Sequence, residues 1–434
     1  MTSDLLTVKL EKLVYGGDAL GRLPDPLTGA GGRAVFVPFG LPGETVSARA
    51  IEEKRGHVRA ELVEVLEPSP ARISPKCKHF GICGGCHYQH LPYQAQLQAK
   101  TEILRDQLAR IGKIENPPVK PMISSSHEWN YRNHIQFHLT HEGKLGYVSL
   151  TPNPSPREAP PKGAGKRARS EGIISITECH LPEAPLNEVW PRLEFDPGLE
   201  LERVSLRLGA GDETMLVLES GNPEPPELEL EADLSVVHLT EGDMVVMAGD
   251  KDLVVSVNDR PFHVSAASFF QVNTGMAGEM VEHLLDNLPV TQDTTLLDVY
   301  CGVGLFSAFF APRVGRLIGI ESSPSACEDF TANLAEFENV ELYEAPAEAV
   351  LPALDVTPEA VIVDPPRAGL EKRAAEALLA QGPERIAYVS CDPSTLGRDA
   401  ARLIAGGYRL TQVTPFDLFP QTYSIESISI LEKG

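Results

Sequence analysis

The sequence predicts an α/β protein built from a C-terminal parallel sheet, a small N-terminal β-barrel and a central, mainly β domain. After about residue 275, apolar strands alternate with helical segments, which indicates a parallel sheet with helices on both faces. Short strands broken by glycine turns fill residues 4–66, and apolar residues recur with a period of two between 130 and 265. We therefore place domain boundaries at 1–67, 68–270 and 271–434.

The composition is that of an ordinary globular protein. The 434 residues suffice for about three domains, 42% of them are hydrophobic, and no run of 18 apolar residues predicts a membrane span. The first residues lack the basic and apolar regions of a signal peptide, so we expect a cytoplasmic protein with no membrane partner. In that compartment the seven cysteines should be reduced or bound to metal rather than paired as disulfides.

The charge distribution is uneven. A formal net charge of −23 argues at face value against nucleic-acid binding, because such affinity comes largely from neutralising phosphates. Acidic residues crowd into 223–243, however, and basic residues gather in two groups elsewhere. The first group is Lys54, Arg55, His57 and Arg59; the second is Arg157, Lys162, Lys166, Arg167 and Arg169.

The N-terminal part predicts a barrel followed by a helix. Strands are expected at 7–10, 33–37, 45–51 and 57–66, and roughly 60 residues of this kind suit a small five-stranded barrel. A helix is expected at 95–112, with Gly112 as its C-cap. Its apolar face would consist of Leu97, Leu104, Leu108 and Ile111.

The segment 130–265 is predicted to be mainly β-structure. Apolar residues alternate with polar ones at Tyr131, Ile135, Phe137 and Leu139. Strand pairs are expected at 203–208 with 214–218 and at 244–248 with 253–258. The loop 151–170, rich in proline, glycine and basic residues, is expected to be mobile.

Four cysteines have the pattern of a metal site. Cys77, Cys83 and Cys86 form C-x5-C-x2-C with glycines among them, and glycine permits the sharp turns that converging thiolates require. Cys179, much further along the chain, is the obvious fourth ligand. Four thiolates suit tetrahedral zinc or an iron–sulfur cluster, and the distant fourth cysteine favours iron–sulfur, since zinc sites more often use two C-x2-C pairs. The central domain is therefore expected to carry a metal cluster.

A glycine turn predicts a cofactor site. The segment 295–304 is a strand that runs into Gly302-Val303-Gly304 and then a helix, and such glycines let the backbone approach a nucleotide-like cofactor. The next strand ends in Glu321, a position that suits a carboxylate binding ribose hydroxyls. Asp298, before the turn, fits S-adenosylmethionine better than NAD.

Two further strands each deliver a reactive side chain to the same edge. The strand 360–363 leads to Asp364, and the apolar run 385–389 leads to Cys391. Open α/β sheets bind their ligands at the carboxyl ends of the strands. Cys301 belongs to the glycine loop and Cys327 to a helix, so Cys391 is the thiol left for covalent chemistry beside the cofactor.

Over nearly its whole length the chain resembles the RNA 5-methyluridine (uracil-C5) methyltransferase family. The barrel resembles a TRAM domain, an RNA-binding relative of oligonucleotide-binding barrels, and the four cysteines match the 4Fe–4S site of the ribosomal-RNA members. Asp392 stands where the family usually has Asn, and Ser424 where it usually has His. The matching motifs are SFFQVN at 268–273, DPPRAG at 364–369, YVSCD at 388–392 and DLFPQTYSIE at 417–426.

This resemblance implies a Rossmann-like methyltransferase sheet and a role for each site residue. Cys391 would add to C6 of uracil, which makes C5 reactive enough to accept a methyl group from S-adenosylmethionine. Glu426 would then remove the C5 proton so that the enzyme is released. The cofactor would be held by Gln271, Tyr300, Gly302, Gly304, Glu321 and Asp364, and the 4Fe–4S cluster by Cys77, Cys83, Cys86 and Cys179.

The expected partner is RNA, and the expected substrate is a specific uridine of 23S ribosomal RNA, because the resembling bacterial tRNA enzymes usually lack both barrel and cluster. A uracil in folded RNA must be splayed out of its stack, and the barrel, the basic residues at 157–169 and Arg132 are candidate RNA contacts. Phe269 and Phe270 either stack on the target or pack in the core. Two other hypotheses stay open: a tRNA uridine-C5 methyltransferase, and a catalytically impaired RNA-binding ribosome-assembly factor. We expect a monomer.

Overall fold

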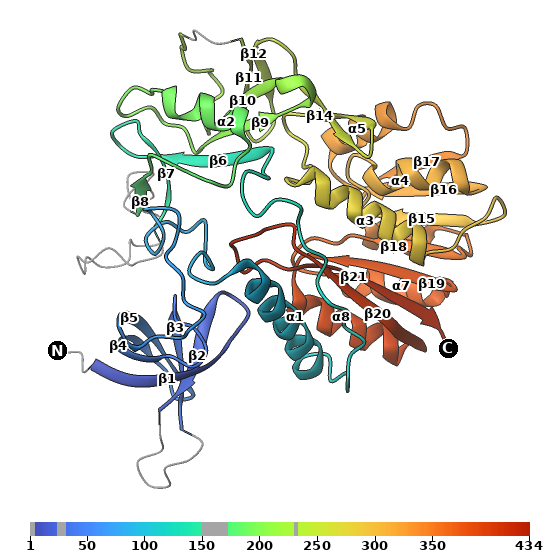
Figure 1. The fold of residues 1–434 in the computed structure, drawn as a ribbon. Coiled ribbons are helices and arrows are strands. Elements are labelled where there is room, and N and C mark those ends of the chain that lie inside the picture. The colour runs from blue at the N-terminus through green and yellow to red at the C-terminus, as the bar shows by residue number, and fades with distance from the viewer. Residues whose placement is uncertain (1–4, 24–31, 150–171, 230–232) are drawn as a thin grey trace.

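The computed structural model describes residues 5–23, 32–149, 172–229 and 233–434. Figure 1 shows a small barrel, a central sheet and a larger C-terminal α/β unit, with the long helix α1 (Tyr93–Arg110) lying between the barrel and the C-terminal unit. The loop 151–170, expected to be mobile, lies outside the described residues. In the part of the chain that is described, no helix is long and apolar enough to cross a membrane.

The N-terminal strands close into the five-stranded barrel that the sequence predicts, in the order β1-β2-β3-β5-β4. Alternate residues point inward, so that Val8, Leu10, Val35, Val37 and Val58 are almost fully buried. The short strand after the Gly16-Gly17 turn is not among the predicted strands. The barrel strands are β1 (Leu5–Leu13), β2 (Asp18–Arg22), β3 (Ala34–Pro38), β4 (Thr45–Glu53) and β5 (His57–Glu67).

Helix α1 (Tyr93–Arg110) buries Leu97, Leu104 and Leu108, as predicted, but Ile111 is 42% exposed. The predicted C-cap is also wrong, because the helix ends with Ile111 as its C-cap. Gly112 serves a different purpose. A Cβ there would lie 2.8 Å from the carbonyl oxygen of Gly397, so the missing side chain lets the end of α1 approach helix α8 (Pro393–Ala405) closely.

The central part forms a seven-stranded sheet in the order β12-β11-β10-β9-β6-β7-β8. The alternation predicted from residue 131 is confirmed, since Ile135, Phe137 and Leu139 are buried, and β9 pairs with β10 as predicted. One short helix, α2 (Ala184–Val189), accompanies the sheet. The strands are β6 (His134–Leu139), β7 (Leu145–Val148), β8 (Ile173–Ser175), β9 (Arg203–Leu208), β10 (Thr214–Glu219), β11 (Ser235–Leu239) and β12 (Met244–Ala248).

The second predicted strand pair of this region is wrong. Residues 244–248 form β12, which pairs with β11 rather than with the segment at 253–258. That segment is β13 (Asp252–Val257), and it forms a separate hairpin with β14 (Arg260–Ser265). A period of two identifies a strand and its buried face, but it does not identify the partner strand.

The C-terminal sheet has seven strands in the order β17-β16-β15-β18-β19-β21-β20. The first five strands are parallel, as predicted, and their interior members are buried on both faces. Strand β21, which is last in the chain and lies between β19 and β20 in the sheet, runs antiparallel to both of these neighbours. The sheet is therefore mixed rather than purely parallel. The strands are β15 (Thr295–Val299), β16 (Arg316–Glu321), β17 (Val340–Glu344), β18 (Ala360–Val363), β19 (Arg385–Ser390), β20 (Tyr408–Phe416) and β21 (Glu426–Lys433).

Helices cover the C-terminal sheet, and some of them begin at side-chain caps. Asn273 accepts a hydrogen bond at the start of α3, and Asp392 accepts two at the start of α8. Cys327 is buried in α5, as predicted. The helices are α3 (Thr274–Asn287), α4 (Leu305–Phe310), α5 (Pro324–Asn333), α6 (Ala347–Val350), α7 (Lys372–Gln381) and α8 (Pro393–Ala405).

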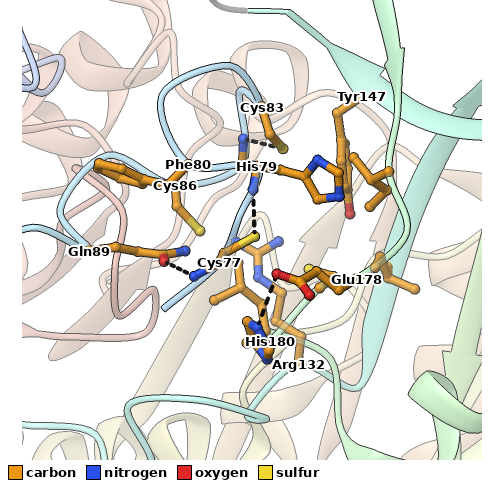
Figure 2. A pocket seen from close by; sticks show the side chains of 15 residues that line it. Cys77, His79, Phe80, Cys83, Cys86, Gln89, Arg132, Tyr147, Glu178 and His180 are labelled. Atoms are coloured by element: carbon orange, nitrogen blue, oxygen red, sulfur yellow. Dashed lines mark hydrogen bonds and ion pairs between the residues drawn. The ribbon is translucent and has the colours of Figure 1, made fainter. Parts of the chain in front are cut away.

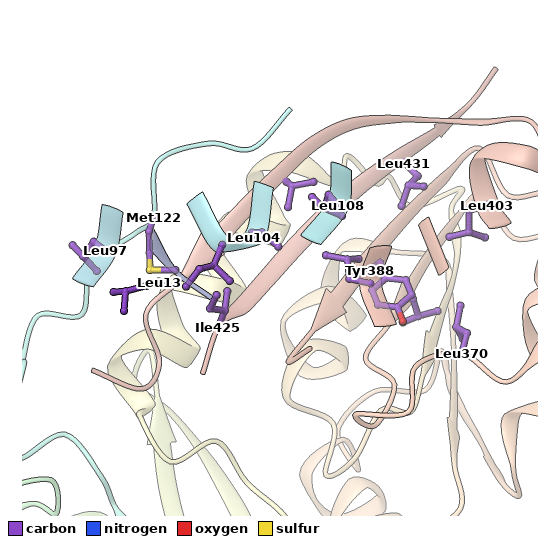
Figure 3. Packing of buried hydrophobic residues seen from close by; sticks show 14 of the residues in the cluster. Leu13, Leu97, Leu104, Leu108, Met122, Leu370, Tyr388, Leu403, Ile425 and Leu431 are labelled. Carbon is purple, nitrogen blue, oxygen red and sulfur yellow. The ribbon is translucent and has the colours of Figure 1, made fainter. Parts of the chain in front are cut away.

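One apolar core connects the barrel to the C-terminal sheet. Leu13 of the barrel, Leu104 of α1 and Ile425 before β21 belong to the same cluster of buried side chains (Figure 3). The cluster continues to Tyr388 of β19 and Leu403 of α8. The barrel is therefore packed through α1 onto the elements that carry the candidate catalytic residues.

Candidate functional site

The strand order places the two predicted catalytic residues at one edge of the C-terminal sheet. Cys391 follows the last residue of β19, and Glu426 is the first residue of β21. Because these strands are antiparallel neighbours, the end of one lies beside the start of the other, and Ser390 pairs with Ser427. Asp364, which follows β18, reaches the same edge because β18 is parallel to β19.

The glycine turn after β15 has a backbone that suits a close ligand. The backbone angle φ is 65° at Tyr300, 54° at Gly302 and 89° at Gly304. Positive values of φ favour glycine, which occupies two of these three positions. A Cβ on Gly304 would lie 2.4 Å from Leu334 Cδ1, whereas a Cβ on Gly302 would point into open space. The Gly302 N–H donates to Oε2 of Glu321 at 3.0 Å, which joins the turn to the end of β16.

Three carboxyl groups cluster around this turn. Asp298 is fully buried; it accepts a 2.6 Å hydrogen bond from Ser307 on Oδ2, while Oδ1 has no partner in the described part of the chain. Burial raises the pKa of Asp298 to about 6. Burial, together with the charges of Asp298 and Glu321, raises the pKa of Asp364 to about 7. A cationic ligand would relieve this repulsion, and S-adenosylmethionine carries both a sulfonium and an ammonium group, so these residues fit the predicted cofactor.

Cys391 is a half-buried thiol in an acidic environment. Burial raises its pKa to about 12, and the charges of Glu426 and Asp364 add to the effect. Arg367, in the loop after β18, acts in the opposite direction and is the main positive charge near the thiol. A change in nearby charge would therefore alter the reactivity of Cys391.

Glu426 is buried beside Cys391, with 8% of its surface exposed. Burial raises the pKa of this carboxyl well above its usual value; the charge of Asp364 adds to the shift, and Arg367 opposes it. Once it has lost its own proton, a carboxylate with a raised pKa is a stronger base, so the position and environment of Glu426 suit a general base.

The loop that leads from β20 to Glu426 is anchored by a buried ion pair between Asp417, the first residue of the predicted motif, and Lys100, which the sequence did not single out. Lys100 of α1 and Asp417 are both fully buried, and Lys100 Nζ lies 2.6 Å from Asp417 Oδ1. The same ammonium group donates to the carbonyl oxygen of Phe419 at 3.0 Å. A buried lysine paired in this way constrains the loop strongly, because neither charge has water to replace its partner.

Gln421 connects this loop to α1 and to the cysteine segment. The side chain of Gln96 exchanges two hydrogen bonds with Gln421, at 3.0 and 3.1 Å. The carbonyl oxygen of Gln421 accepts the backbone N–H groups of His87 and Tyr88, at 2.8 and 3.0 Å. The residues next to Cys86 therefore contact the loop that carries Glu426.

The segment 268–273 leads into α3 and divides its aromatic residues between two environments. Phe270 packs against Phe262, with ring centroids 5.8 Å apart. Phe269 is 72% exposed, so it is free to stack on a base. Gln271 is half-buried, and its carbonyl oxygen accepts a hydrogen bond from Asn133 of the central domain.

Four cysteines from two distant segments line one pocket (Figure 2). Cys77, Cys83 and Cys86 come from the loop after the barrel, and Cys179 comes from the loop after β8. The backbone N–H of His79 donates to Cys77 Sγ, and that of Gly85 donates to Cys83 Sγ, both at 3.4 Å. In the described residues, however, no three side chains of ligating types are arranged closely enough to hold a metal ion.

The chemistry of this pocket suits a cationic metal centre. Burial raises the pKa of Cys86 to about 12 and that of Cys179 to about 11, with a contribution from neighbouring cysteines to both. A bound metal ion would offset the cost of forming these buried thiolates, since it binds cysteine in the thiolate form. Arg132 lines the same pocket and lies over the rings of Tyr131 and Phe419.

The predicted RNA contacts differ in their surroundings. Lys54 and Arg59, on the β4–β5 side of the barrel, lie 2.8 and 3.9 Å from Glu52 and are exposed. Arg132 faces the cysteine pocket, as described above. The basic residues of the second group, Arg157, Lys162, Lys166, Arg167 and Arg169, lie outside the described residues.

The N-terminal and the C-terminal parts of the chain each match the model of a known protein family. Residues 4–63 match the model of the TRAM domain, and residues 228–434 match the model of the tRNA (uracil-5-)-methyltransferase family. An uncharacterised RNA methyltransferase of Aquifex aeolicus is 33% identical, with 98% of each chain covered. Another, from Halalkalibacterium halodurans, is 31% identical and covers 99% of this chain and 97% of its own length.

A solved structure matches the whole fold. The tRNA (uracil-54, C5)-methyltransferase of Pyrococcus abyssi, in complex with S-adenosyl-L-homocysteine, superposes with a TM-score of 0.73. The match covers 98% of this chain and 100% of the other, at 24% identity, and it confirms the expected fold. The two family models and the full-length relatives show that the chain belongs to the RNA uracil-C5 methyltransferase family with an N-terminal TRAM domain, as its motifs predict.

Proposed function

We propose that this protein transfers a methyl group from S-adenosylmethionine to C5 of a specific uridine in RNA, through a covalent bond between Cys391 and C6. The observation that carries the proposal is the meeting of a thiol and a buried carboxyl at adjacent strand ends, Cys391 after β19 and Glu426 at the start of β21. Asp364 and the glycine turn lie at the same edge of the sheet.

In this proposal the chain performs two steps on the base. The Cys391 thiol gives up its proton to solvent and adds as the thiolate to C6, and the π electron pair of the C5–C6 double bond moves toward the carbonyl group, which makes C5 nucleophilic. S-adenosylmethionine, when bound, supplies the methyl group that C5 accepts. The Glu426 carboxylate then removes the C5 proton, the C5–C6 double bond re-forms, and the thiolate leaves.

The residues around the glycine turn would hold the methyl donor. Tyr300, Gly302, Gly304 and Glu321 belong to the turn and the strand end that it contacts, and Asp364 lies at the next strand end. Gln271 would contribute from the segment before α3. The acidic environment favours a cationic donor, and it favours release once methyl transfer has removed the positive charge from sulfur.

The proposed substrate is 23S ribosomal RNA. The barrel and the four cysteines support it, because the sequence resembles the ribosomal-RNA members in both. The second candidate is transfer RNA, which is the substrate in the name of the structural neighbour from Pyrococcus abyssi. Mapping 5-methyluridine in both RNAs from cells with and without the gene distinguishes the two, since the missing modification identifies the substrate.

Trapping with 5-fluorouridine tests the covalent step. In the presence of S-adenosylmethionine we expect the protein to form an adduct with 5-fluorouridine RNA that survives denaturing electrophoresis, because after methyl transfer the fluorine at C5 cannot be removed as a proton. Cys391→Ala should form none, and Cys327→Ala, which changes a buried thiol in α5, should still form it. If the unmodified protein binds this RNA without an adduct, the chain is an RNA-binding assembly factor or another kind of enzyme.

We propose that Cys77, Cys83, Cys86 and Cys179 hold a 4Fe–4S cluster, with zinc as the alternative. The shared pocket and the N–H groups directed at two of the sulfur atoms support this. The cluster would stabilise the segment that contacts Gln421, so its role would be structural.

We expect anaerobically purified protein to contain about four iron atoms and four acid-labile sulfides per chain, and removal of the cluster should lower the melting temperature. Cys179→Ala should lose the iron, whereas Cys327→Ala should retain it. Stoichiometric zinc without sulfide would favour the alternative metal site.

A further inference from the structure

A barrel residue reaches the turn that carries Cys391. Tyr15 lies between β1 and β2, and its hydroxyl donates a 3.0 Å hydrogen bond to Oδ2 of Asp392. These two residues are 377 positions apart in the sequence. The Tyr15 ring also packs edge-on against Tyr423, with centroids 5.7 Å apart, so it contacts both segments that carry the catalytic residues.

Asp392 holds the turn around Cys391 in place. Its Oδ1 accepts the backbone N–H groups of Ser394 and Thr395, at 2.8 and 2.9 Å, and so caps helix α8. Its own N–H donates to the hydroxyl of Ser390, at 3.2 Å. Cys391 lies between these two anchored residues, so the position of its thiol depends on Asp392.

A carboxylate at position 392 has a second oxygen that needs a hydrogen-bond donor, whereas an amide would have its NH2 group there. Asp392 stands where the resembling family usually has Asn, and it adds a negative charge next to Cys391, one of the charges that raise the thiol pKa. Oδ1 is occupied by the helix cap, and Tyr15 supplies a donor to Oδ2. Burial and the charge of Asp392 raise the pKa of Tyr15 well above its usual value, so its hydroxyl keeps the proton that it donates.

We propose that Tyr15 of the TRAM barrel is a positioning residue for the nucleophile: it holds the Asp392 carboxylate, which fixes the turn and the charge beside Cys391. The inference rests on the proposed role of Cys391. It adds a function for the barrel besides the expected binding of RNA, because in this inference the same small domain also sets the reactivity of the thiol.

The two partners have opposite expected effects on thiol reactivity. Tyr15→Phe removes the donor, leaves the Asp392 charge less compensated, and should slow alkylation of Cys391 at pH 8 by about threefold, the change that roughly half a pKa unit produces. Asp392→Asn removes the charge and should accelerate alkylation by about the same factor. In an Asp392→Asn background, Tyr15→Phe should have almost no further effect, since no charge remains to be compensated.

The experiment measures iodoacetamide labelling of Cys391 by peptide mass spectrometry between pH 6 and 10, without RNA or methyl donor. The pH profile also reports the other charges that face the thiol, Glu426, Asp364 and Arg367, which all variants retain. Tyr88→Phe is the matched control, because the buried Tyr88 hydroxyl has no hydrogen-bond partner in the described part of the chain. It should label at the wild-type rate.

Binding and turnover complete the test. Tyr15→Phe should lower kcat of methyl transfer while Kd for RNA, measured by fluorescence anisotropy, changes less than about twofold. Unchanged labelling, or an equal effect of Tyr15→Phe with and without Asp392→Asn, would overturn the inference. Labelling needs neither RNA nor the methyl donor, so it tests the effect of Tyr15 on Cys391 separately from catalysis. If the variants label as expected but the wild-type protein transfers no methyl group, the proposed function is refuted and the effect of Tyr15 on Cys391 still holds.

Discussion

Replacement of Glu426 by Gln is expected to abolish turnover and to trap the enzyme on ordinary RNA. The amide is nearly the same size as the carboxyl but cannot accept the C5 proton, so the bond between Cys391 and C6 cannot be eliminated. Loss of a general base typically costs about 10² to 10⁴ in rate, and we expect an effect in that range. The first half of the reaction should still proceed.

The measurement is denaturing electrophoresis of protein mixed with unmodified RNA and S-adenosylmethionine. Glu426→Gln should give a shifted band, wild type little, and the double variant with Cys391→Ala none. Glu432→Gln is the matched control, because Glu432 lies on the same strand but is half-buried and pairs with Arg409. Full turnover by Glu426→Gln without an adduct would show that another group removes the proton.

The same variant should change how stability depends on pH. The pKa of Glu426 is raised in the folded protein, so the folded state keeps a proton that the unfolded chain releases. That contribution is present below the ordinary value of about 4.5 and is lost as pH rises toward the folded pKa. Denaturant unfolding should therefore show Glu426→Gln close to wild type at low pH and increasingly more stable than wild type as pH rises.

Replacement of Lys100 by Met is expected to destabilise the protein by about 3–5 kcal/mol, because it leaves the Asp417 carboxylate buried without its cation. It should also lower turnover, since Lys100 holds the loop that leads to Glu426 through Asp417 and the Phe419 carbonyl. Adding Asp417→Asn to Lys100→Met should recover part of the stability, since the buried charge is then gone.

Denaturant unfolding measures these differences, and Lys12→Met supplies the control. Lys12 also pairs with an aspartate, Asp106, at 2.9 Å, but its side chain is 46% exposed. Exposed ion pairs contribute at most about 1 kcal/mol, so Lys12→Met should be nearly neutral. Equal effects of the two substitutions would mean that the Lys100 pair is not the anchor of the loop.

Much of the fold was predictable from local patterns. The apolar runs before Asp364 and Cys391 identify interior parallel strands, and a residue that follows such a strand must lie at the carboxyl edge of the sheet. The alternation at Ile135 and Phe137 likewise identified a half-buried strand. Where the prediction failed, at the pairing of 244–248, the pattern defined a face but not a neighbour.

The position of Glu426 beside Cys391 could not be obtained from such patterns. It depends on the insertion of β21, antiparallel, between β19 and β20. The contacts of Lys100 with Asp417 and of Tyr15 with Asp392 connect residues separated by 317 and 377 positions, and no period in the sequence marks them.

The sequence by itself predicted the candidate residues for the chemistry and most of the strands and helices, because these predictions depend on side-chain type and on periods of two or 3.6 residues. Only the tertiary structure decided which strand ends are neighbours, which buried charges have partners, and which barrel residue contacts the nucleophile's turn. These follow from the packing of elements far apart in the chain, where the burial of apolar faces selects one arrangement and the polar contacts form where that arrangement permits them.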